Sequence, residues 1–296
     1  MPIFRTACPA CGSPQLDVVL EAEDHTVSHE HFEIVECGAC TLRFTQRAPE
    51  AEEIGPYYQS EEYVSHSNTS KGLINEAYQQ VRALTLKQKL SLLQKTTGLQ
   101  TGSVLDVGCG TGEFLHTMQG AGWQTRGLEP DAGARAYAKE EYELEVTEPQ
   151  DLFALDGPYD AVTLWHVLEH VHQLHDYLDQ LRKLIGASGT LIIAVPNYTS
   201  SDAKHYGAKW AAYDVPRHLY HFSPQAMGRL LDEHDLRLRE LRAMPFDAFY
   251  VSLLSERYAN GGLRPVQAFS EGLKSWWPSR SRPEQASSIM YICGAA

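Results

Sequence analysis

The stretch Val104-Leu105-Asp106-Val107-Gly108-Cys109-Gly110-Thr111-Gly112 decides the fold. An apolar run ends in an acid, alternating glycines follow, and residues 113–118 continue with the pattern of a helix. Strand, glycine turn and helix form the entry to a nucleotide-type pocket in an α/β sheet. A pyrophosphate loop reads G-x-G-x-x-G, because two phosphates sit on the helix N-terminus. Here the glycines alternate and Asp106 would repel a pyrophosphate. The loop therefore favours a ligand that carries an ammonium or sulfonium group, and it disfavours NAD.

The residues VLDVGCGTGEFL at 104–115 resemble the first signature of class I S-adenosylmethionine-dependent methyltransferases. The resemblance implies an α/β fold, with a Rossmann-like seven-stranded methyltransferase sheet and helices on both faces. It also implies S-adenosylmethionine as the cofactor, with Asp106 at its methionine end. The loop residues that this assigns to the cofactor are Gly108, Cys109, Gly110 and Gly112.

Two further acids are candidates for the same ligand. Glu129 follows an expected strand at 125–128 and lies 23 residues beyond Asp106. An acid about 20 residues past the glycine loop is placed to accept hydrogen bonds from both ribose hydroxyls. Within the resemblance, an acid or amide after the third strand meets the adenine amino group, and Asp151 is the candidate. Its competitors are Glu148, Gln150 and Asp156.

Residues 49–98 are polar and rich in tyrosine, and residues 73–93 have a helical pattern. In similar methyltransferases a Tyr-rich segment before the first strand folds over the cofactor, so the resemblance implies a helical lid. Tyr58 would then face the cofactor, because aromatic faces attract a sulfonium. The alternative is that the tyrosines (Tyr57, Tyr58 and Tyr63) pack the N-terminal module on the catalytic domain.

The N-terminal module contains two cysteine knuckles, Cys8-x-x-Cys11 and Cys37-x-x-Cys40. Paired C-x-x-C knuckles in a reducing compartment are typical of a Cys₄ zinc site. The metal would supply folding energy that about 45 residues do not obtain from a core alone. Two structural disulfides are the alternative, which an intracellular location disfavours. Residues 1–48 are therefore expected to form a zinc ribbon with a structural Zn²⁺ ion.

Composition narrows the class of protein. The chain has 296 residues with 43% hydrophobic content, enough for an α/β domain and a small module. No apolar run approaches the roughly 18 residues of a membrane span, and no signal-peptide pattern is visible, so a cytoplasmic location is expected without stable membrane insertion. The 25 basic and 38 acidic residues give a net charge of −13. This charge opposes binding to a nucleic acid or an anionic membrane.

Histidines are the candidate catalytic groups. Residues 159–166 have the pattern of a strand, and they resemble the fourth-strand segment of class I methyltransferases, whose C-terminal edge faces the transferring methyl. His166 lies at that edge, as a catalytic and cofactor-contacting candidate, and His170 follows one helical turn later. His218 lies in an aromatic-rich loop after the fifth strand, and His221 is a weaker candidate. A histidine near neutral pKa is the natural base for a hydroxyl acceptor.

A metal-assisted variant is also open. Glu169-His170 resembles a Glu-His pair that binds a divalent ion in ubiquinone-pathway O-methyltransferases. Those enzymes carry another glutamate where this chain has His166.

A wider resemblance covers nearly the whole chain. The ribbon, the Tyr-rich segment, the cofactor core and the residues PRHLYHF at 216–222 resemble zinc-ribbon-bearing bacterial methyltransferases of sugar and polysaccharide biosynthesis. This implies a small-molecule acceptor, a sugar or saccharide intermediate. Some sugar C-methyltransferases with this ribbon carry a further C-terminal domain, whereas this chain ends after the expected seventh strand. O-methylation is therefore the expected reaction.

Two other function classes remain. One is an rRNA or tRNA methyltransferase whose zinc module grips RNA. Residues 1–50 oppose it, because three basic against eight acidic residues give them a charge of −5, where an RNA-gripping ribbon should be basic. The other is a non-catalytic zinc-ribbon interaction protein with a degenerate methyltransferase fold, which the intact Asp106, glycines and Glu129 oppose.

The expected organisation is a ribbon, a lid and a cofactor domain with an insertion on its substrate side. Their bounds are 1–48, 49–98, 99–296 and, within the last, 198–223. Residues 259–287 are rich in Gly, Pro, Ser and Arg. They are expected to form a poorly ordered connection or a contact surface.

Overall fold

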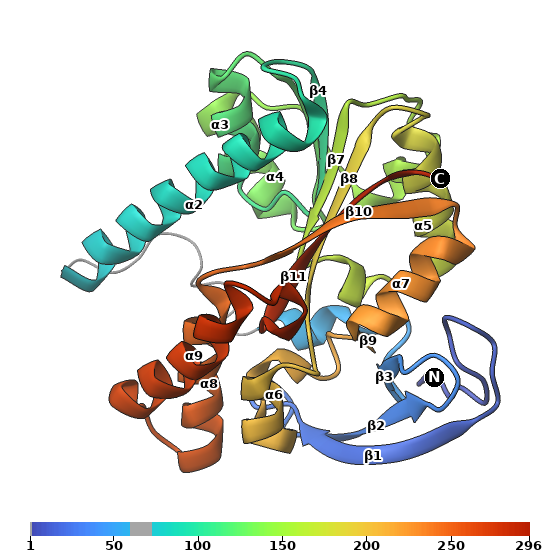
Figure 1. Ribbon diagram of the computed structural model, residues 1–296, viewed down its shortest axis with the longest axis vertical. Helices are drawn as coiled ribbons and strands as arrows, with labels where there is room; N and C mark the ends of the chain where they lie inside the picture. The colour runs from blue at the N-terminus through green and yellow to red at the C-terminus, as the bar shows by residue number, and fades with distance from the viewer. Residues whose placement is uncertain (1, 60–72) are drawn as a thin grey trace.

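The computed structural model describes residues 2–59 and 73–296, with side chains described for residues 2–59 and 82–296. Tyr63 lies outside the described residues. Two β-sheets organise the described chain, a large sheet and a small N-terminal sheet (Figure 1). Within the described ranges, no helix combines the length and apolar character needed to cross a bilayer.

The large sheet has seven strands in the order β10-β11-β8-β7-β4-β5-β6. Strands β4 to β8 pair in parallel, whereas β11 is antiparallel to both β8 and β10. Their bounds are β4 Ser103–Val107, β5 Gln124–Leu128, β6 Val146–Thr147, β7 Ala161–Trp165, β8 Thr190–Pro196, β10 Leu236–Ala243 and β11 Ser288–Ala295. The expected α/β methyltransferase fold is confirmed.

Helices cover both faces of the large sheet. Figure 1 shows α2, α3 and α4 on one side and α5 and α7 on the other. Their bounds are α2 Leu73–Thr97, α3 Glu113–Gly120, α4 Ala132–Tyr142, α5 Leu174–Leu184 and α7 Pro224–Glu233. The leucines of α5 at positions 174, 178, 181 and 184 are buried, and this i, i+4, i+7 spacing places them on one face against the sheet.

The small sheet has the order β1-β2-β3-β9. The first three strands are β1 Leu16–Glu23, β2 His31–Cys37 and β3 Arg43–Thr45, and they form antiparallel pairs. The fourth, β9 Tyr220–His221, comes from the insertion after β8 and pairs with β3. The ribbon region and the insertion therefore share one sheet, and their buried side chains belong to the same core as the large sheet.

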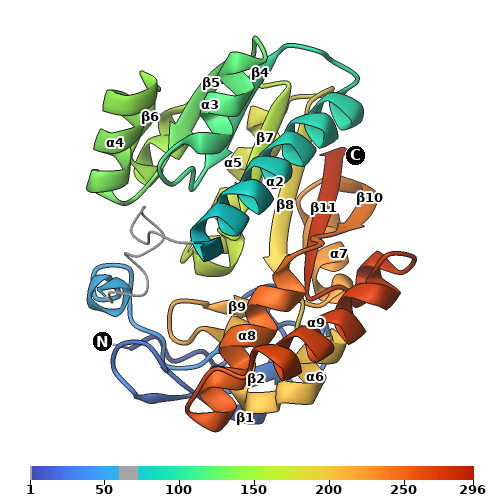
Figure 2. The ribbon, with the colours of Figure 1, turned by 90° about the vertical axis from the view of Figure 1, so that its left-hand side faces the viewer.

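The insertion and the C-terminal helices form a layer next to the small sheet (Figure 2). It contains α6 Ser201–Tyr206, α8 Asp247–Asn260, α9 Pro265–Ser279 and 3₁₀ turns at Gly207–Lys209, Ala211–Tyr213 and Pro283–Gln285. The expectation of a poorly ordered connection over 259–287 is wrong, because most of this segment is α9. Pro265 at the first helical position fits the helix, since proline has no N–H to lose there. The remaining short helices are 3₁₀ turns at Gly55–Tyr58, Pro149–Ala154 and Leu168–His170.

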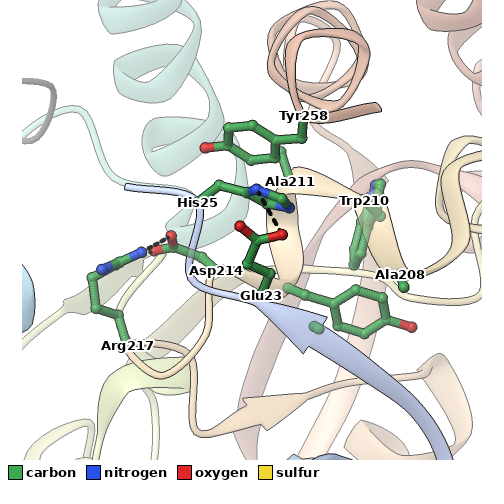
Figure 3. Close-up of a pocket in the computed structure, with 10 residues that line it drawn as sticks. Glu23, His25, Ala208, Trp210, Ala211, Asp214, Arg217 and Tyr258 are labelled. Carbon is green, nitrogen blue, oxygen red and sulfur yellow. Dashed lines mark hydrogen bonds and ion pairs between the residues drawn. The ribbon is translucent and has the colours of Figure 1, made fainter. Parts of the chain in front are cut away.

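A buried arginine connects the small sheet to the insertion. Arg217 is 1% exposed, and its Nη2 donates to Asp24 Oδ1 at 3.0 Å and to Asp214 Oδ1 at 2.7 Å. Its Nη1 donates to the carbonyl oxygen of Tyr57 at 2.7 Å. Figure 3 shows the pair of Arg217 with Asp214 at this junction. One guanidinium thus joins the β1–β2 turn, the start of the Tyr-rich segment and the insertion.

Removal of this cation should destabilise the protein strongly. Arg217→Met leaves the buried carboxylate of Asp24 and the half-buried carboxylate of Asp214 without their counter-charge, and we expect the free energy of unfolding to fall by about 3–5 kcal/mol. Chemical denaturation measures it. The exposed Arg237 provides the matched variant Arg237→Met, which should shift stability by less than about 0.5 kcal/mol. Equal stabilities of the two variants would contradict the assignment.

Candidate functional site

The site lies where the strand order of the large sheet reverses, between β4 and β7. Ligands of open α/β sheets bind at such a switch point, beyond the carboxyl ends of the strands. Asp106 and Thr163 are register partners across these two strands. The Thr163 hydroxyl donates to Asp106 Oδ1 at 2.5 Å, and Asp106 is only 2% exposed. The acid that sequence analysis assigned to the cofactor is thus held at the switch point.

Burial changes the ionisation of Asp106. It raises the pKa of this carboxyl to about 7, against the hydrogen bond from Thr163 and the charge of Lys89, which both lower the pKa. The nearby charge of Glu129 raises it further. Near neutral pH, the Asp106 carboxyl is therefore only partly ionised. A cationic ligand group would favour its charged form.

The glycine loop needs glycine for two physical reasons. Gly108 and Gly112 have φ of 72° and 86°, in the left-handed region that other residues avoid. A Cβ on Gly108 would come within 2.4 Å of Val167 Cγ2. The N–H groups of Gly108 and Cys109 donate to the carbonyl oxygen of Leu128, which ties the loop to the end of β5. At Gly108 glycine is therefore required both by the backbone conformation and by the close packing of Val167.

Glu129 supports the same loop. Its two carboxylate oxygens accept hydrogen bonds from the N–H groups of Gly110 at 2.8 Å and of Asp131 at 2.9 Å. Burial raises its pKa, while these two N–H groups lower it. Glu129 therefore holds the glycine loop in shape, and its oxygens lie at the strand end where ribose hydroxyls were expected.

Sequence analysis missed a lysine at this site. Lys89 of α2 places Nζ 3.9 Å from the centre of the Trp165 ring. Burial lowers its pKa to about 8, while the charges of Asp106 and Asp247 raise it. An aromatic face beside carboxylates is the surrounding that suits a sulfonium or ammonium group. In the sequence, Lys89 is one of several cations in a helical stretch, and only the fold brings it to Asp106.

The other assigned cofactor residues have less direct positions. Cys109 is buried against Gly127, where a Cβ would meet its Sγ at 2.6 Å, so its thiol packs behind the loop. Asp151 lies half-buried in the turn Pro149–Ala154. Tyr58 lies 3.0 Å from His170 Nδ1 through its hydroxyl, which places it at the histidines. Their contacts with the cofactor remain predictions.

His166 is clamped between two carboxylates. Its Nε2 lies 2.9 Å from Asp247 Oδ2, at the start of α8, and its Nδ1 lies 3.3 Å from Glu169 Oε1. Although burial lowers the pKa of the imidazole, the two carboxylates raise it to about 10. The residue has φ of 59°, so the backbone turns sharply after β7. At neutral pH His166 is a cation with both ring nitrogens engaged.

A second group lies one turn further on. Donor atoms of Glu169, His170 and His218 all lie within 4.8 Å of one another. Glu169 is fully buried, and its Oε2 has no hydrogen-bond partner among the described residues. Burial lowers the pKa of His170 to about 4, so this ring is neutral. A buried oxygen without a partner indicates that a further group belongs here.

The tautomer of His218 follows from its contacts. Its Nδ1 donates to the carbonyl oxygen of Ala212 at 2.8 Å, so Nε2 carries the lone pair in the neutral ring. Nε2 lies 3.9 Å from Asp214 Oδ2. His221 is engaged elsewhere: it is buried, and its Nε2 lies 3.1 Å from Thr45 Oγ1 in the small sheet. Of the two candidate histidines in the insertion, His218 and His221, only His218 thus joins the group at Glu169.

The four N-terminal cysteines form a separate cluster. Sγ atoms lie 3.5 Å apart for Cys8 and Cys40 and 3.6 Å apart for Cys11 and Cys37, and all four are free thiols. A tetrahedron with Zn–S distances of about 2.3 Å has edges of roughly 3.8 Å, whereas a disulfide needs about 2.05 Å. Burial raises the pKa of the Cys8 and Cys40 thiols, whereas N–H groups of Cys40 and Ala39 lower the pKa of Cys37 to about 7. The four sulfur atoms in this arrangement fit a structural zinc ion, whose binding would displace their protons.

A small cavity lies between the small sheet and the insertion (Figure 3). His25 stacks on Tyr258 at its edge, with ring centres 4.2 Å apart. The cavity has about 10 Å³, room for one water molecule. It is too small for a methyl acceptor.

Known proteins match this chain in its central part. Residues 76–241 match the family model described as a methyltransferase domain. Two curated relatives are both named ubiquinone biosynthesis O-methyltransferase. The one from Pectobacterium atrosepticum is 30% identical over 186 residues, which are 57% of this chain and 73% of that protein. The one from Glaesserella parasuis is 27% identical over 174 residues, 52% of this chain and 72% of that protein.

Solved structures share the fold. Magnesium protoporphyrin IX methyltransferase from Synechocystis PCC 6803 with bound SAH has a TM-score of 0.51 at 15% identity, covering 81% of this chain and 96% of that one. A putative sarcosine dimethylglycine methyltransferase from Galdieria sulphuraria also has a TM-score of 0.51 at 15% identity, covering 71% and 85%. At this identity the likeness concerns the fold alone.

Affinity for S-adenosylhomocysteine should depend on pH through Asp106. Below a pKa of about 7 this carboxyl is protonated and loses its attraction for the ligand's ammonium group. We therefore expect binding about tenfold weaker at pH 6 than at pH 8. Asp106→Asn should weaken binding at pH 8 and remove most of this dependence, and Glu129→Gln should weaken binding about 10–100-fold. Calorimetric titration measures both. The exposed Asp232 of α7 supplies the control Asp232→Asn, and unchanged affinity in both site variants would refute the assignment.

We expect one zinc ion per chain. Elemental analysis of protein purified without added metal measures it. Cys8→Ser should lose the metal and loosen the small sheet, because metal binding is local folding energy. Hydrogen exchange should then rise in β1 to β3 and also in β9, which pairs with β3. Cys293→Ala, at a buried cysteine outside the cluster, should keep the zinc. A metal-free native protein, or a disulfide between the knuckles under reducing conditions, would overturn this expectation.

Proposed function

Because the chain belongs to the methyltransferase-domain family and is an S-adenosylmethionine-dependent methyltransferase, we propose that it methylates a hydroxyl group of a small-molecule acceptor. The group formed by Glu169, His170 and His218 carries this proposal. It brings two imidazole rings together with a buried carboxylate oxygen that has no hydrogen-bond partner among the described residues. A hydroxyl needs both an orienting acceptor and a proton acceptor, and this group offers both. The names of the curated relatives, which are O-methyltransferases, support the same chemistry.

His218 is the proposed base. Because Nδ1–H is held by the carbonyl oxygen of Ala212, the lone pair at Nε2 faces the Glu169 group. Bound S-adenosylmethionine supplies the electrophilic methyl group. His218 Nε2 takes the hydroxyl proton as the acceptor oxygen becomes nucleophilic, and the carboxylate of Asp214, 3.9 Å from Nε2, stabilises the imidazolium that forms.

Glu169 and His170 orient the acceptor in this scheme. Glu169 Oε2 accepts a hydrogen bond from the substrate, which satisfies a buried oxygen that the described residues leave unpaired. His170 is neutral, and its low pKa makes it a better hydrogen-bond partner than proton acceptor. Both residues follow directly from β7, so the sheet fixes their positions.

His166 has a different role in the proposal. Because both its ring nitrogens face carboxylates and its pKa is raised to about 10, it has no free lone pair at neutral pH. We assign it to positioning: it holds Glu169 in place and joins the start of α8 to the end of β7. The sequence analysis named both His166 and His218 as candidate bases. We therefore propose His218 as the base and not His166.

A divalent ion at the same group is the second candidate. The donor atoms of Glu169, His170 and His218 are two nitrogens and a carboxylate oxygen, a set that divalent transition metals accept. Here the third donor comes from His218 of the insertion, whereas the ubiquinone-pathway pattern would place a glutamate at His166. The same residues would then hold a metal that polarises the hydroxyl, and chelation distinguishes the two versions.

The acceptor class is the finer part of the proposal. We keep a sugar or saccharide intermediate as the acceptor, on the resemblance of the ribbon and of residues 216–222 to methyltransferases of saccharide biosynthesis. The acidic ribbon supports a small molecule over RNA. The proposal also includes a cytoplasmic location and a structural zinc ion. It keeps residues 48 and 98 as the ends of the ribbon and of the lid.

Loss of the proposed base should lower kcat and spare cofactor binding. An acceptor screen with nucleotide sugars, saccharide intermediates and catechols comes first. Catechols are included because their phenolic hydroxyls are more acidic than the hydroxyls of sugars. His218→Ala should then reduce kcat about 10²–10⁴-fold and leave the affinity for S-adenosylhomocysteine within about twofold. His166→Gln should raise KM as well, because the orientation of Glu169 is lost. His31→Gln, at an exposed histidine of β2, is the matched control.

The pH profile and a chelator test the alternatives. In wild type the acidic limb of kcat should report the base, and it should disappear in His218→Ala. Activity that EDTA removes and Mn²⁺ restores would favour the metal version. Full activity of His218→Ala with an unchanged acidic limb would reject general-base catalysis by this residue, leaving proximity as the source of the rate.

A further inference from the structure

Helix α9 presents its large apolar side chains to solvent. Val266, Phe269, Leu273 and Trp277 are 78%, 61%, 38% and 64% exposed. They recur at i, i+3, i+7 and i+11, which places them along one face of the helix. With Leu263, which is 64% exposed just before the helix, they form what we call the α9 stripe.

The opposite face of α9 carries small residues and packs inward. Ala268, Gly272, Ser275 and Ser279 are buried. A Cβ on Gly272 would come within 2.8 Å of the Phe249 ring, so α8 and α9 approach closely there. A helix at the surface of a globular protein usually has the reverse pattern, with its large apolar side chains turned to the core. Most of the surface of the α9 stripe is therefore left exposed by the fold that the structure describes.

The charge around the stripe differs from that of the rest of the chain. Residues 261–282 contain four basic residues and one acid, a charge of +3 within a chain of −13. The basic residues are Arg264, Lys274, Arg280 and Arg282. The Arg280 guanidinium lies 5.2 Å from the ring centres of both Trp276 and Trp277, so a cation sits directly at the end of the stripe. The local charge at this place is thus opposite in sign to the net charge of the chain, and it complements an anionic partner.

The stripe continues towards the proposed active site. Phe249 of α8 stacks on Phe269 with ring centres 5.4 Å apart and lies 6.2 Å from Trp276. At the first turn of α8, Tyr250 is 52% exposed, and Asp247 of the same turn contacts His166. Figure 2 shows α8 and α9 side by side at the outside of this layer. A surface that covers α9 would therefore lie next to the start of α8, which closes one side of the site.

From these observations we propose that the α9 stripe docks the protein on an anionic lipid surface. An amphipathic helix with tryptophan, phenylalanine and leucine on one face and flanking arginines and lysine lies in the bilayer interface, with its apolar face among the acyl chains. Tryptophan and arginine favour this depth, because both have an apolar body and a polar or charged tip. The contact is peripheral, and it does not depend on which acceptor the enzyme methylates.

A second copy of the chain fits the stripe less well. Symmetric pairing of two α9 helices would bring two basic segments of +3 together, and like charges across an interface are unfavourable. An anionic surface instead complements them. Self-association through the stripe is therefore the competing outcome that the experiment must separate.

Vesicle co-sedimentation of the full chain tests the proposal. We expect binding to vesicles of phosphatidylglycerol and phosphatidylcholine in equal parts, and binding at least tenfold weaker to pure phosphatidylcholine. The double variant Phe269→Ser/Trp277→Ser should weaken binding to the anionic vesicles at least tenfold, because both rings enter the bilayer. Arg280→Glu/Arg282→Glu should weaken it and reduce its dependence on salt.

The control is Val18→Ser, at a valine of β1 that is 60% exposed, and it should bind like wild type. All variants should keep wild-type affinity for S-adenosylhomocysteine, which shows that they are folded. Absence of binding to anionic vesicles, or binding that the stripe variants do not change, would overturn the proposal. So would a wild-type dimer by light scattering that does not bind vesicles and that Phe269→Ser/Trp277→Ser turns into a monomer, since the stripe would then pair two copies.

Discussion

The ion pairs of the Arg217 guanidinium group are the interactions on which the proposed acceptor site, at Glu169, His170 and His218, depends. It neutralises the buried carboxylate of Asp24, in the turn between β1 and β2, and the half-buried carboxylate of Asp214, in the insertion. The carbonyl oxygen of Arg217 lies 3.0 Å from His170 Nδ1, and the next residue along the chain is His218. Two candidate site histidines are thus positioned by one buried cation, because a charge that leaves water must keep its partners in place.

Charge pairing of the same kind organises the cofactor side. The charges of Asp106 in β4 and Lys89 in α2 stabilise each other, and burial moves both pKa values towards neutrality. A ligand that carries an ammonium, a sulfonium and a carboxylate offers both residues new partners. His166, by contrast, already has two carboxylates, so its charge is balanced by the protein alone. The site therefore separates into groups whose charge a ligand completes and groups whose charge the fold completes.

Short-range patterns carried most of what the sequence could predict. The glycine loop after β4 and the cysteine knuckles are local, because a few consecutive residues set their geometry. They predicted the fold class, which the structure confirms, and the clustering of the four cysteines. Asp247 was missed because it meets His166 across 81 residues, a pairing that no local spacing announces. The expectation of a poorly ordered connection over residues 259–287 rested on composition. The apolar spacing i, i+3, i+7 from Val266 in the same segment predicts a helix. Composition describes a segment on average, whereas periodicity describes its faces.

The pairing of β3 with β9 bears on how this protein can be inherited or re-engineered. In the sequence the N-terminal module resembles a separate domain. Its sheet is nevertheless completed by Tyr220 and His221, close to 180 residues after Arg43 and Phe44. A recombination event that exchanged the first 48 residues alone would pair one parent's β3 with the other parent's β9, so the side chains packed across this pair would no longer match. The heritable unit is therefore two separated pieces of chain. Chimeras intended to change acceptor choice must carry both pieces from the same parent.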